Sequence, residues 1–555
     1  MIRNTTSRKS LGAYYTHETV ADFLVGWAVR SPGDAVMDPS FGGGVFLRSA
    51  GRRIRSLGGT PAKQLCGVEV DADAHSRTAA MLGREFGVRP SRLVQRDFFE
   101  LEPRWRAVDA VVGNPPFIRY QRFSGRSRGL ALRRARSEGV KLSELCSSWA
   151  PFLVHAVSMV RRGGRLAMVV PFEMTHAAYA RPVLSWVCQA FAKTTLLTFQ
   201  HKAFPDLSED TLLVLAEDRG GKGTELAWRD LRSPAELQDL AASGINGNGV
   251  RHLDHAAICR GEYRFIKCLL PRSVRDLYDR LAGRDDVARL GDVADVGIGY
   301  VSGANDFFHM SPEEAAERGI PRRFLTPAVR RGKALTGLQF TKGDWTAGLA
   351  GKQTALLLHL NGDVQPDGAL RRYLEEGRRR GVANAYKCRV RSPWYCVPHV
   401  CAPDAFLTYM NGKVPKLVAN TAGAVAPNNL HMVRIKPMCG LEGTDLAGRW
   451  YNSLTRLSVE IEGHALGGGM LKLEPSEARR VCVPLPKGVD TSNLVRRVDR
   501  LCRAGRNEEA RELADRAILI DGLHLSQRDC AVLAEGANVL LRRRYERGKG
   551  PARVD

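Results

Sequence analysis

The stretch Val111-Val112-Gly113-Asn114-Pro115-Pro116-Phe117 decides the fold of the region around it. Its apolar start predicts a buried strand. The two prolines predict that the strand ends there, because a proline has no N–H to donate to a sheet ladder. In open α/β sheets, ligands bind beyond the carboxyl ends of the strands. The turn therefore places an amide side chain, a backbone carbonyl and an aromatic ring where a ligand is expected.

The residues Asn114, Pro115, Pro116 and Phe117 suit the alkylation of a planar amino group. The exocyclic amine of adenine is a weak nucleophile because its lone pair is delocalised into the ring. The Asn114 side-chain oxygen and the Pro115 carbonyl can each accept one N–H, which localises the lone pair, while Phe117 stacks on the base. The alternative is a plain Pro-Pro turn in which Asn114 caps a backbone group. These four residues alone leave both interpretations open.

Two earlier strands lead into further polar side chains. Residues 34–38 predict a short strand that runs into a glycine loop, residues 42–44, and then a helix, which is the first unit of a nucleotide-binding α/β fold. The loop lacks the lysine of a Walker motif, so phosphate binding is not favoured. A second strand, residues 65–70, contains Glu69 near its end, where a carboxylate is placed to accept both hydroxyls of a ribose.

A third strand, residues 92–95, is followed by Asp97 and Phe98. We interpret Asp97 as an acceptor for the amino group of a ligand adenine and Phe98 as a ring that packs on it; the alternative is a strand-end turn. Further strands are predicted at residues 107–112, 165–170, 194–199 and 211–217. The last two have a short connection, which predicts an antiparallel hairpin. Together these strands predict a Rossmann-like α/β sheet of seven strands.

The charge of the chain points to a polyanionic partner. The net charge is +24 and the isoelectric point is about 9.8, and nucleic acid is the commonest partner of such a protein. The alternative is general surface solubility in an arginine-rich proteome. Residues 119–141 are rich in arginine, and we interpret them as a mobile loop in which Arg122 and Arg126 touch phosphates. A solvated charged face is the alternative for this segment.

Cysteines and hydropathy bear on the compartment. The 12 cysteines form no C-x-x-C pair and no Cys/His cluster at zinc spacing, so we expect free thiols and no metal site. The amino terminus lacks the apolar region of a signal peptide, and no apolar run is long enough to span a bilayer. We therefore expect a cytoplasmic, nucleoid-associated bacterial protein that has no membrane partner.

The ordered set of motifs resembles the amino-methylating DNA methyltransferases, and within them the gamma arrangement typified by the TaqI-type modification methylases. The resembling segments are Gly12–Thr16 (motif X), Asp38–Leu47 (motif I), Gly67–Asp71 (motif II), Asp97-Phe98 (motif III), Asn114–Phe117 (the catalytic motif IV) and Phe204-Pro205 (motif VIII). The resemblance covers residues 12 to about 218, and the later part of the chain more loosely. One departure is Phe117, where tyrosine is common in the family.

The resemblance implies a class I methyltransferase fold and S-adenosylmethionine as the cofactor. The residues that it assigns to the cofactor are Thr16, Asp38, Ser40, Gly42, Gly44, Glu69, Val70, Asp97 and Phe98. It assigns the target amino group to the turn from Asn114 to Phe117, and stacking on an extruded base to Phe117 and Phe204. The base must be extruded because its target atom lies inside a duplex stack. Core packing is the alternative role for Phe204.

The chain divides into four predicted segments. Residues 1–225 are the catalytic domain, 226–289 a linker with helices, 290–490 a mixed α+β domain, and 491–555 a basic helical tail. The resemblance makes the mixed domain a target-recognition domain, which would read base edges in the major groove. The candidate reading residues are Asn305, Arg389, Arg391 and Asn428.

We therefore predict a sequence-specific, adenine-specific DNA methyltransferase that acts on N6 in double-stranded DNA, as the modification enzyme of a restriction-modification system. The alternatives are N4-cytosine methylation, RNA adenine methylation and methylation of a protein glutamine. A fused nuclease is disfavoured because no PD…(D/E)-x-K pattern is convincing, and a non-catalytic specificity subunit is disfavoured by the intact motifs. We expect a monomer, with any cognate endonuclease acting as a separate protein.

Overall fold

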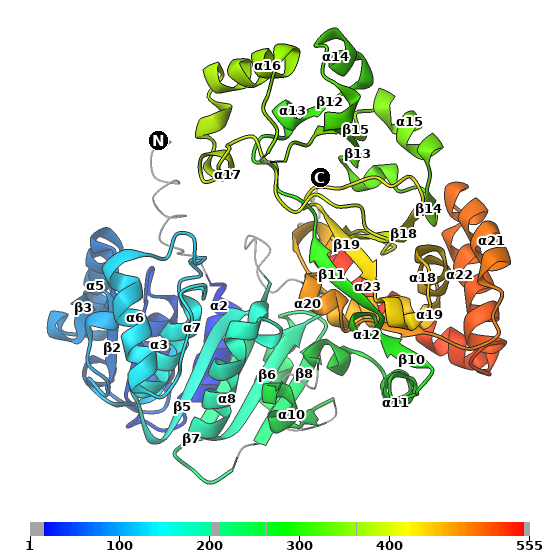
Figure 1. The fold of residues 1–555 in the computed structure, drawn as a ribbon. Coiled ribbons are helices and arrows are strands. Elements are labelled where there is room, and N and C mark those ends of the chain that lie inside the picture. Colours follow the sequence, from blue (N-terminus) through cyan, green and yellow to red (C-terminus); the bar gives the residue numbers. More distant parts are fainter. Residues whose placement is uncertain are drawn as a thin grey trace, which may run out of the picture. The chain divides into compact units, whose positions relative to one another are not determined.

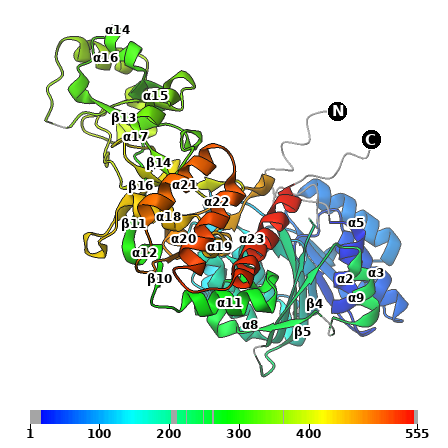
Figure 2. The same cartoon turned by 90° about the vertical axis from the view of Figure 1, so that its right-hand side faces the viewer.

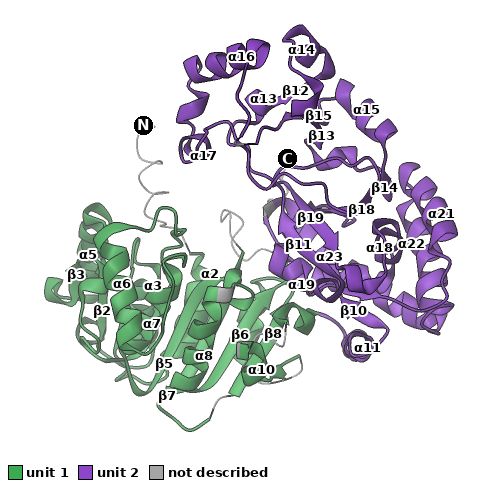
Figure 3. Ribbon diagram, in the orientation of Figure 1, with its two compact units in different colours: residues 1–269, 549–555 green, residues 270–548 purple. Residues whose placement is uncertain are grey.

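The computed structural model describes residues 16–201, 210–223, 225–245, 247, 249–260, 264–361 and 363–548. The chain divides into two compact units, coloured separately in Figure 3. Unit 1 comprises residues 1–269 and 549–555, and unit 2 comprises residues 270–548. The boundary therefore lies inside the segment 226–289 for which the sequence predicts a linker.

Unit 1 is built on a sheet whose described part has nine strands in the order β3-β2-β1-β4-β5-β7-β6-β8-β9 (Figure 1). The strands are β1 (Val36–Asp38), β2 (Leu65–Glu69), β3 (Leu93–Gln95), β4 (Val108–Gly113), β5 (Val160–Pro171), β6 (Phe191–Phe199), β7 (Thr211–Arg219), β8 (Glu225–Leu231) and β9 (Arg251–Leu253). Strands β1 to β5 run parallel, and β7 lies antiparallel between β5 and β6. The predicted α/β sheet with an antiparallel hairpin is confirmed.

The sheet is larger than the seven strands that the sequence predicts. Strand β8 pairs parallel with β6, and β9 pairs antiparallel with β8. Leu226, Trp228 and Leu231 of β8 are buried, so this segment is core and not a linker. The polar and glycine-rich connections on either side hide these two short strands in the sequence.

Helices of unit 1 pack on both faces of the sheet. They are α2 (Glu18–Ala28), α3 (Val45–Ser56), α4 (Pro61–Gln64), α5 (Ala72–Phe86), α6 (Gly125–Ser137), α7 (Trp149–Ser158), α8 (Arg181–Ala190), α9 (Glu236–Ser243) and α10 (His255–Arg260). Helix α2 packs against α3 and α9, whereas α7 packs against α6 and α8. Figure 2 shows α2, α3 and α9 on one side of β4 and β5, and α8 on the other. Both faces of the sheet are thus covered, which explains its continuous apolar strands.

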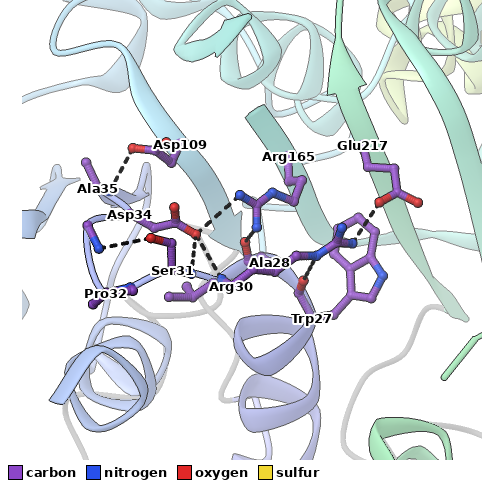
Figure 4. A network of polar contacts seen from close by, with 12 residues as sticks. Trp27, Ala28, Arg30, Ser31, Pro32, Asp34, Ala35, Asp109, Arg165 and Glu217 are labelled. Atoms are coloured by element: carbon purple, nitrogen blue, oxygen red, sulfur yellow. Dashed lines mark hydrogen bonds and ion pairs between the residues drawn. The ribbon is translucent and has the colours of Figure 1, made fainter. Parts of the chain in front are cut away.

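A polar network holds the amino end of β1. Asp34 Oδ2 accepts hydrogen bonds from the N–H groups of Arg30 (2.8 Å) and Ser31 (3.2 Å), and it forms an ion pair with Arg165 (3.3 Å). Arg30 forms a further ion pair with Glu217 of β7 (2.7 Å). Figure 4 shows Asp34 between the Arg30 backbone and the Arg165 guanidinium. This network ties the start of β1 to β5 and β7, while the opposite end of β1 carries Asp38.

Unit 2 is a mixed α+β structure with a five-stranded sheet in the order β11-β19-β16-β18-β14 and three smaller sheets among its described residues. Its strands are β10 (Val287–Arg289), β11 (Ala294–Ile298), β12 (His309–Met310), β13 (Leu325–Val329), β14 (Gln339–Phe340), β15 (Thr354–Leu358), β16 (Ala405–Thr408), β17 (Met410–Asn411), β18 (Leu417–Asn420), β19 (Leu430–Ile435), β20 (His464–Ala465), β21 (Leu471–Lys472) and β22 (Cys482–Pro484). The predicted mixed domain is thus present, with wider bounds.

The helices of unit 2 include the predicted basic tail. They are α11 (Arg272–Ala282), α12 (Leu290–Val293), α13 (Asn305–Phe308), α14 (Pro312–Glu317), α15 (Lys342–Ala350), α16 (Gly368–Arg379), α17 (Tyr386–Arg389), α18 (Gly443–Trp450), α19 (Ser453–Glu462), α20 (Pro475–Ala478), α21 (Thr491–Arg503), α22 (Asn507–Ala514) and α23 (Gln527–Gly548). Helix α21 packs on α18, and α23 packs on α19. These last helices are therefore part of the core of unit 2 and not a separate tail. Among the helices that the structure describes, we find no candidate for a membrane span.

Candidate active site

Three neighbouring strands of unit 1 end in the polar residues that the sequence singles out. Asp38 ends β1, Glu69 ends β2, and Asn114 directly follows β4. Strand β1 lies between β2 and β4 and runs parallel to both. The three side chains consequently meet at the carboxyl edge of the sheet, which is the edge where α/β sheets bind ligands.

Asp38 is a buried carboxyl group that is only partly satisfied. It is 1% exposed, and its Oδ1 accepts a hydrogen bond from the Ser40 N–H (3.0 Å). Its Oδ2 has no hydrogen-bond partner among the described residues. Burial raises the pKa of Asp38 to about 8; the Ser40 N–H opposes this rise, and the charge of Glu69 adds to it. A buried carboxyl group with one free oxygen is well placed to receive a cation.

Glu69 ties the glycine loop to the end of β2. Its Oε2 accepts from the Gly42 N–H (2.8 Å) and its Oε1 from the Asp71 N–H (2.8 Å). Each carboxylate oxygen keeps a second lone pair that can accept a hydroxyl. The next residue, Val70, is 55% exposed and offers an apolar surface that a ligand ring could cover.

The glycine loop needs glycine at two positions for different reasons. Gly42 has a φ of +47°, and a Cβ there would meet no atom within 4 Å, so space remains above the loop. Gly44 has a φ of +80° and precedes α3, and a Cβ there would approach the Thr78 side chain to 2.5 Å. The loop therefore combines a left-handed backbone with a close approach to α5.

Asp97 and Phe98 have structural partners. Asp97 caps a short 3-10 helix, Phe98–Glu100, and accepts from the Phe99 N–H (3.0 Å). Phe98 is buried, and its ring centroid lies 4.7 Å from that of Phe152 and 4.5 Å from that of His155. Burial lowers the pKa of His155 to about 4, so this ring is neutral at pH 7. The contacts with the cofactor adenine thus stay a prediction for Asp97 and Phe98.

The Asn114 amide is held at one end and open at the other. Its Nδ2 donates to Thr16 Oγ1 (3.2 Å), and its backbone carbonyl accepts from Ser40 Oγ (3.2 Å). Its Oδ1 is buried and has no hydrogen-bond partner in the part of the chain that the structure describes. Because a buried acceptor without a partner is costly, this oxygen marks a place for a donor from a ligand.

Of the two aromatic residues predicted to stack on a base, Phe117 is buried and Phe204 lies outside the described residues. Phe117 is 6% exposed and belongs to the apolar core of unit 1. Stacking on a base would require the side chains around it to move. Phe204 and the segment Gly12–Tyr15 lie outside the described residues. The stacking roles of Phe117 and Phe204 therefore stay predictions.

Ser148, which the sequence did not point out, holds the catalytic turn. It is 1% exposed. Its hydroxyl donates to the Pro116 carbonyl (2.5 Å) and accepts from the Ile118 N–H (2.9 Å), and its own N–H donates to the Ile118 carbonyl (2.9 Å). Ser148 directly precedes α7, where a serine is an ordinary helix cap. No local signal in the sequence therefore reveals its contact with a turn far upstream.

Replacing Ser148 with alanine is expected to lower kcat by roughly 10- to 100-fold, because a misplacement of about 1 Å near reacting groups costs on the order of 10²-fold. S-adenosylmethionine affinity should stay within about twofold, since Ser148 forms its hydrogen bonds with Pro116 and Ile118 and not with Asp38 or Glu69. Steady-state methyl transfer and calorimetric cofactor binding measure the two quantities. Ser148→Thr, which keeps the hydroxyl, should recover part of kcat. An unchanged kcat in Ser148→Ala would contradict the positioning role.

The arginine-rich segment after the catalytic turn is largely a helix, and the predicted mobile loop is wrong for most of it. Helix α6 covers Gly125–Ser137 and buries Ala131 and Ala135. Arg134 forms an ion pair with Glu102 (2.7 Å). The side chain of Arg126 is 83% exposed, and Arg122 is also exposed. The alanines four residues apart explain the helix, and the outward arginines leave phosphate contact as a proposal.

The predicted base-reading residues of unit 2 differ in their surroundings. Arg391 donates to the backbone carbonyls of Ser302 (2.8 Å) and Val301, so its guanidinium holds the chain. Asn305 begins α13, and its Oδ1 accepts from the Ser302 hydroxyl (2.5 Å). Arg389 and Asn428 are exposed. The exposed residues Arg389 and Asn428 are therefore better placed to contact DNA than Arg391 and Asn305, which already form hydrogen bonds within the protein.

Two family models match separate parts of the chain. Residues 1–178 match the N-6 DNA Methylase family, and residues 262–519 match the C-terminal domain of the Type II methyltransferase M.Eco57I. The first match contains Asp38, Glu69 and Asn114. The resemblance to amino-methylating DNA methyltransferases is thus confirmed, and the gamma arrangement stays a prediction.

Individual relatives that the chain resembles are Type II methyltransferases. The Type II methyltransferase M.HindII of Haemophilus influenzae is 22% identical over 316 residues, which are 54% of this chain and 56% of that protein. M.XamI of Xanthomonas campestris pv. amaranthicola is 24% identical over 493 residues, 85% of each chain. The DNA complex of the Type IIL restriction-modification enzyme MmeI superposes with a TM-score of 0.55 at 12% identity, over 98% of this chain and 80% of that one. The last similarity concerns the fold.

Proposed function

We propose that this member of the N6-adenine DNA methyltransferases of restriction-modification systems transfers a methyl group from S-adenosylmethionine to adenine N6 in double-stranded DNA. The observation that carries the proposal is Asn114 Oδ1, a buried acceptor without a partner among the described residues, at the same sheet edge as the buried carboxyl group of Asp38. An acceptor for an amino group and a receptor for a cation are the two features that amine methylation from a sulfonium requires. The family matches to both units support the same activity.

The residues at the sheet edge fit S-adenosylmethionine. The cofactor carries an electrophilic methyl group on a positively charged sulfonium. Asp38 offers a buried carboxyl oxygen without a partner among the described residues, and Glu69 offers lone pairs for ribose hydroxyls. Val70 offers an exposed apolar surface to the adenine, and the open space above Gly42 leaves room for the ligand. Each of these features matches a different part of S-adenosylmethionine, so together they support this cofactor.

The catalytic turn positions the target amine. Asn114 Oδ1 and the Pro115 carbonyl accept the two N–H groups, which localises the nitrogen lone pair, so no strong base is needed. Thr16 restrains the other end of the Asn114 amide (3.2 Å), and Ser148 clamps the turn after Pro115. Positioning of this kind supplies most of the catalysis when the leaving group is already activated. The amine proton leaves after transfer.

The proposal is tested in a methylation-deficient bacterial host that expresses this chain or Asn114→Ala. Genomic DNA is sequenced with a method that reports N6-methyladenine at single-base resolution. We expect modified adenine at one short motif with the native chain and none with Asn114→Ala. Met438→Ala, which changes a highly exposed side chain of unit 2, is the matched control and should preserve the motif. Modified cytosine in place of adenine, or no modified DNA at all, would overturn the adenine assignment.

We further propose that the chain acts as a monomer and that any cognate endonuclease is a separate protein. A modification enzyme needs to act on each DNA strand in turn and does not require two copies at once. Light scattering of the purified chain with and without duplex DNA measures the oligomeric state. A stable dimer under both conditions would exclude this arrangement.

A further inference from the structure

The short helix α17 and the residue after it, Val390, carry a group of exposed side chains that the function described so far does not use. Tyr386 is 65% exposed and Val390 is 66% exposed. The Lys387 ammonium lies 5.4 Å, and the Arg389 guanidinium 5.5 Å, from the centroid of the Tyr386 ring. We call Tyr386, Lys387, Arg389 and Val390 the α17 head.

The α17 head is held in place by packing against residues 301–303. Cys388, in the middle of the head, is fully buried, and its Sγ donates to the Ser302 carbonyl (3.7 Å). Arg391 donates to the same carbonyl (2.8 Å) and to that of Val301. A Cβ on Gly303 would approach the Lys387 Cβ to 2.8 Å, so the two segments are in close contact. The exposure of the head is therefore a fixed feature of the fold.

The chemistry of the α17 head matches nucleic acid. Among the described residues, Lys387 and Arg389 contact the Tyr386 ring and no carboxylate forms an ion pair with either, so both cations remain available to phosphates. Exposed aromatic side chains stack on bases, and exposed apolar side chains insert between base steps. Single exposed apolar residues are common, but two beside two cations that have no carboxylate partner among the described residues are typical of an interaction site. The net charge of +24 favours a polyanionic partner.

We propose that the α17 head is a DNA contact that sets the recognition sequence, with Lys387 and Arg389 on phosphates and Tyr386 and Val390 against bases. This inference rests on the proposed function for its partner, duplex DNA. The sequence predicts both Arg389 and Arg391 as base readers; the proposal moves Arg389 to phosphate contact and Arg391 to the support of the head. Residues 386–391 repeat every third position: Tyr386, Lys387, Arg389 and Val390 are exposed, whereas Cys388 is buried and Arg391 is partly buried.

Binding of the purified full-length chain to a fluorescent duplex of mixed sequence tests the phosphate contacts. The double variant Lys387→Ala/Arg389→Ala should weaken binding by about tenfold. It should also reduce the slope of log affinity against log salt by about two, since each phosphate contact contributes about 0.9. Arg497→Ala, an exposed arginine of α21, is the matched control and should change neither quantity. A double variant that behaves like this control would overturn the inference.

The genomic methylation profile tests the base contacts. Tyr386→Ala and Val390→Ala should methylate additional sites that differ from the native motif at one or two positions, while Met438→Ala keeps the native motif. An unaltered motif in both head variants would overturn the specificity role while the proposed function stands. If the native chain binds the duplex but modifies no base, the proposed function fails, and the salt slope still decides whether the head contacts DNA.

Discussion

Replacing Asn114 with alanine is expected to lower the rate of methyl transfer by at least about 10²-fold, the usual effect of removing one preorganised hydrogen-bonding group from a catalytic site. The variant loses Oδ1, the buried acceptor that has no partner among the described residues. S-adenosylmethionine affinity should stay within about twofold, because Asp38 and Glu69 keep their own hydrogen bonds. Single-turnover transfer to duplex DNA and calorimetric binding of the cofactor separate the two effects.

Asn114→Asp is the informative companion to this variant. It keeps an acceptor oxygen at the same position but loses the amide donor to Thr16. It should therefore transfer methyl groups faster than Asn114→Ala and more slowly than the native chain. Equal losses of cofactor binding and transfer in Asn114→Ala would show that the residue supports the cofactor pocket, and would contradict its role toward the target amine.

The strands that carry the site could be predicted from the sequence because each is a short apolar run that ends in a polar residue. The run before Asn114 is buried throughout β4, and the run before Asp38 is buried throughout β1. Parallel strands put such ends at one edge, so the meeting of Asp38, Glu69 and Asn114 follows from strand order. The local sequence pattern is sufficient to predict the site here, because the parallel pairing of the strands brings their distant ends together.

Contacts between distant segments could not be predicted in this way. Ser148 reaches the turn at Pro116 only because α6 and the loop after it bring α7 back to the sheet edge. The engaged state of Arg391 depends on the backbone carbonyl of Ser302, which lies far away in the sequence. Strand β8 could not be predicted because its four buried residues, Leu226, Ala227, Trp228 and Leu231, do not alternate with exposed ones and so show no strand period. In each case tertiary partners, and not local composition, decide the role.

Replacing Asp38 with asparagine is expected to lower S-adenosylmethionine affinity by about 10²-fold and to stabilise the cofactor-free chain at pH 8. Burial raises the pKa of Asp38 to about 8, so the folded chain keeps a proton that the unfolded chain loses near pH 4. The native chain therefore loses stability as pH rises from about 4 to about 8, by up to about 5 kcal/mol. The asparagine side chain does not titrate, so Asp38→Asn should lack this loss. Denaturant unfolding of both chains at pH 5, 6, 7 and 8 measures it.

The same carboxyl group links cofactor binding to proton release. A cation beside Asp38 favours the ionised carboxylate, so binding of S-adenosylmethionine at pH 7 should release close to one proton from the native chain and none from Asp38→Asn. Calorimetry in two buffers with different ionisation enthalpies counts this proton, while Ser40→Ala, which keeps the backbone N–H that bonds Asp38, should still release it. Unchanged affinity together with equal proton release in Asp38→Asn would place the positive charge of the cofactor elsewhere. If Asp38→Asn loses both cofactor affinity and proton release, the buried Asp38 carboxyl group binds the cation. The burial that destabilises the empty site would then also make the site select a cation.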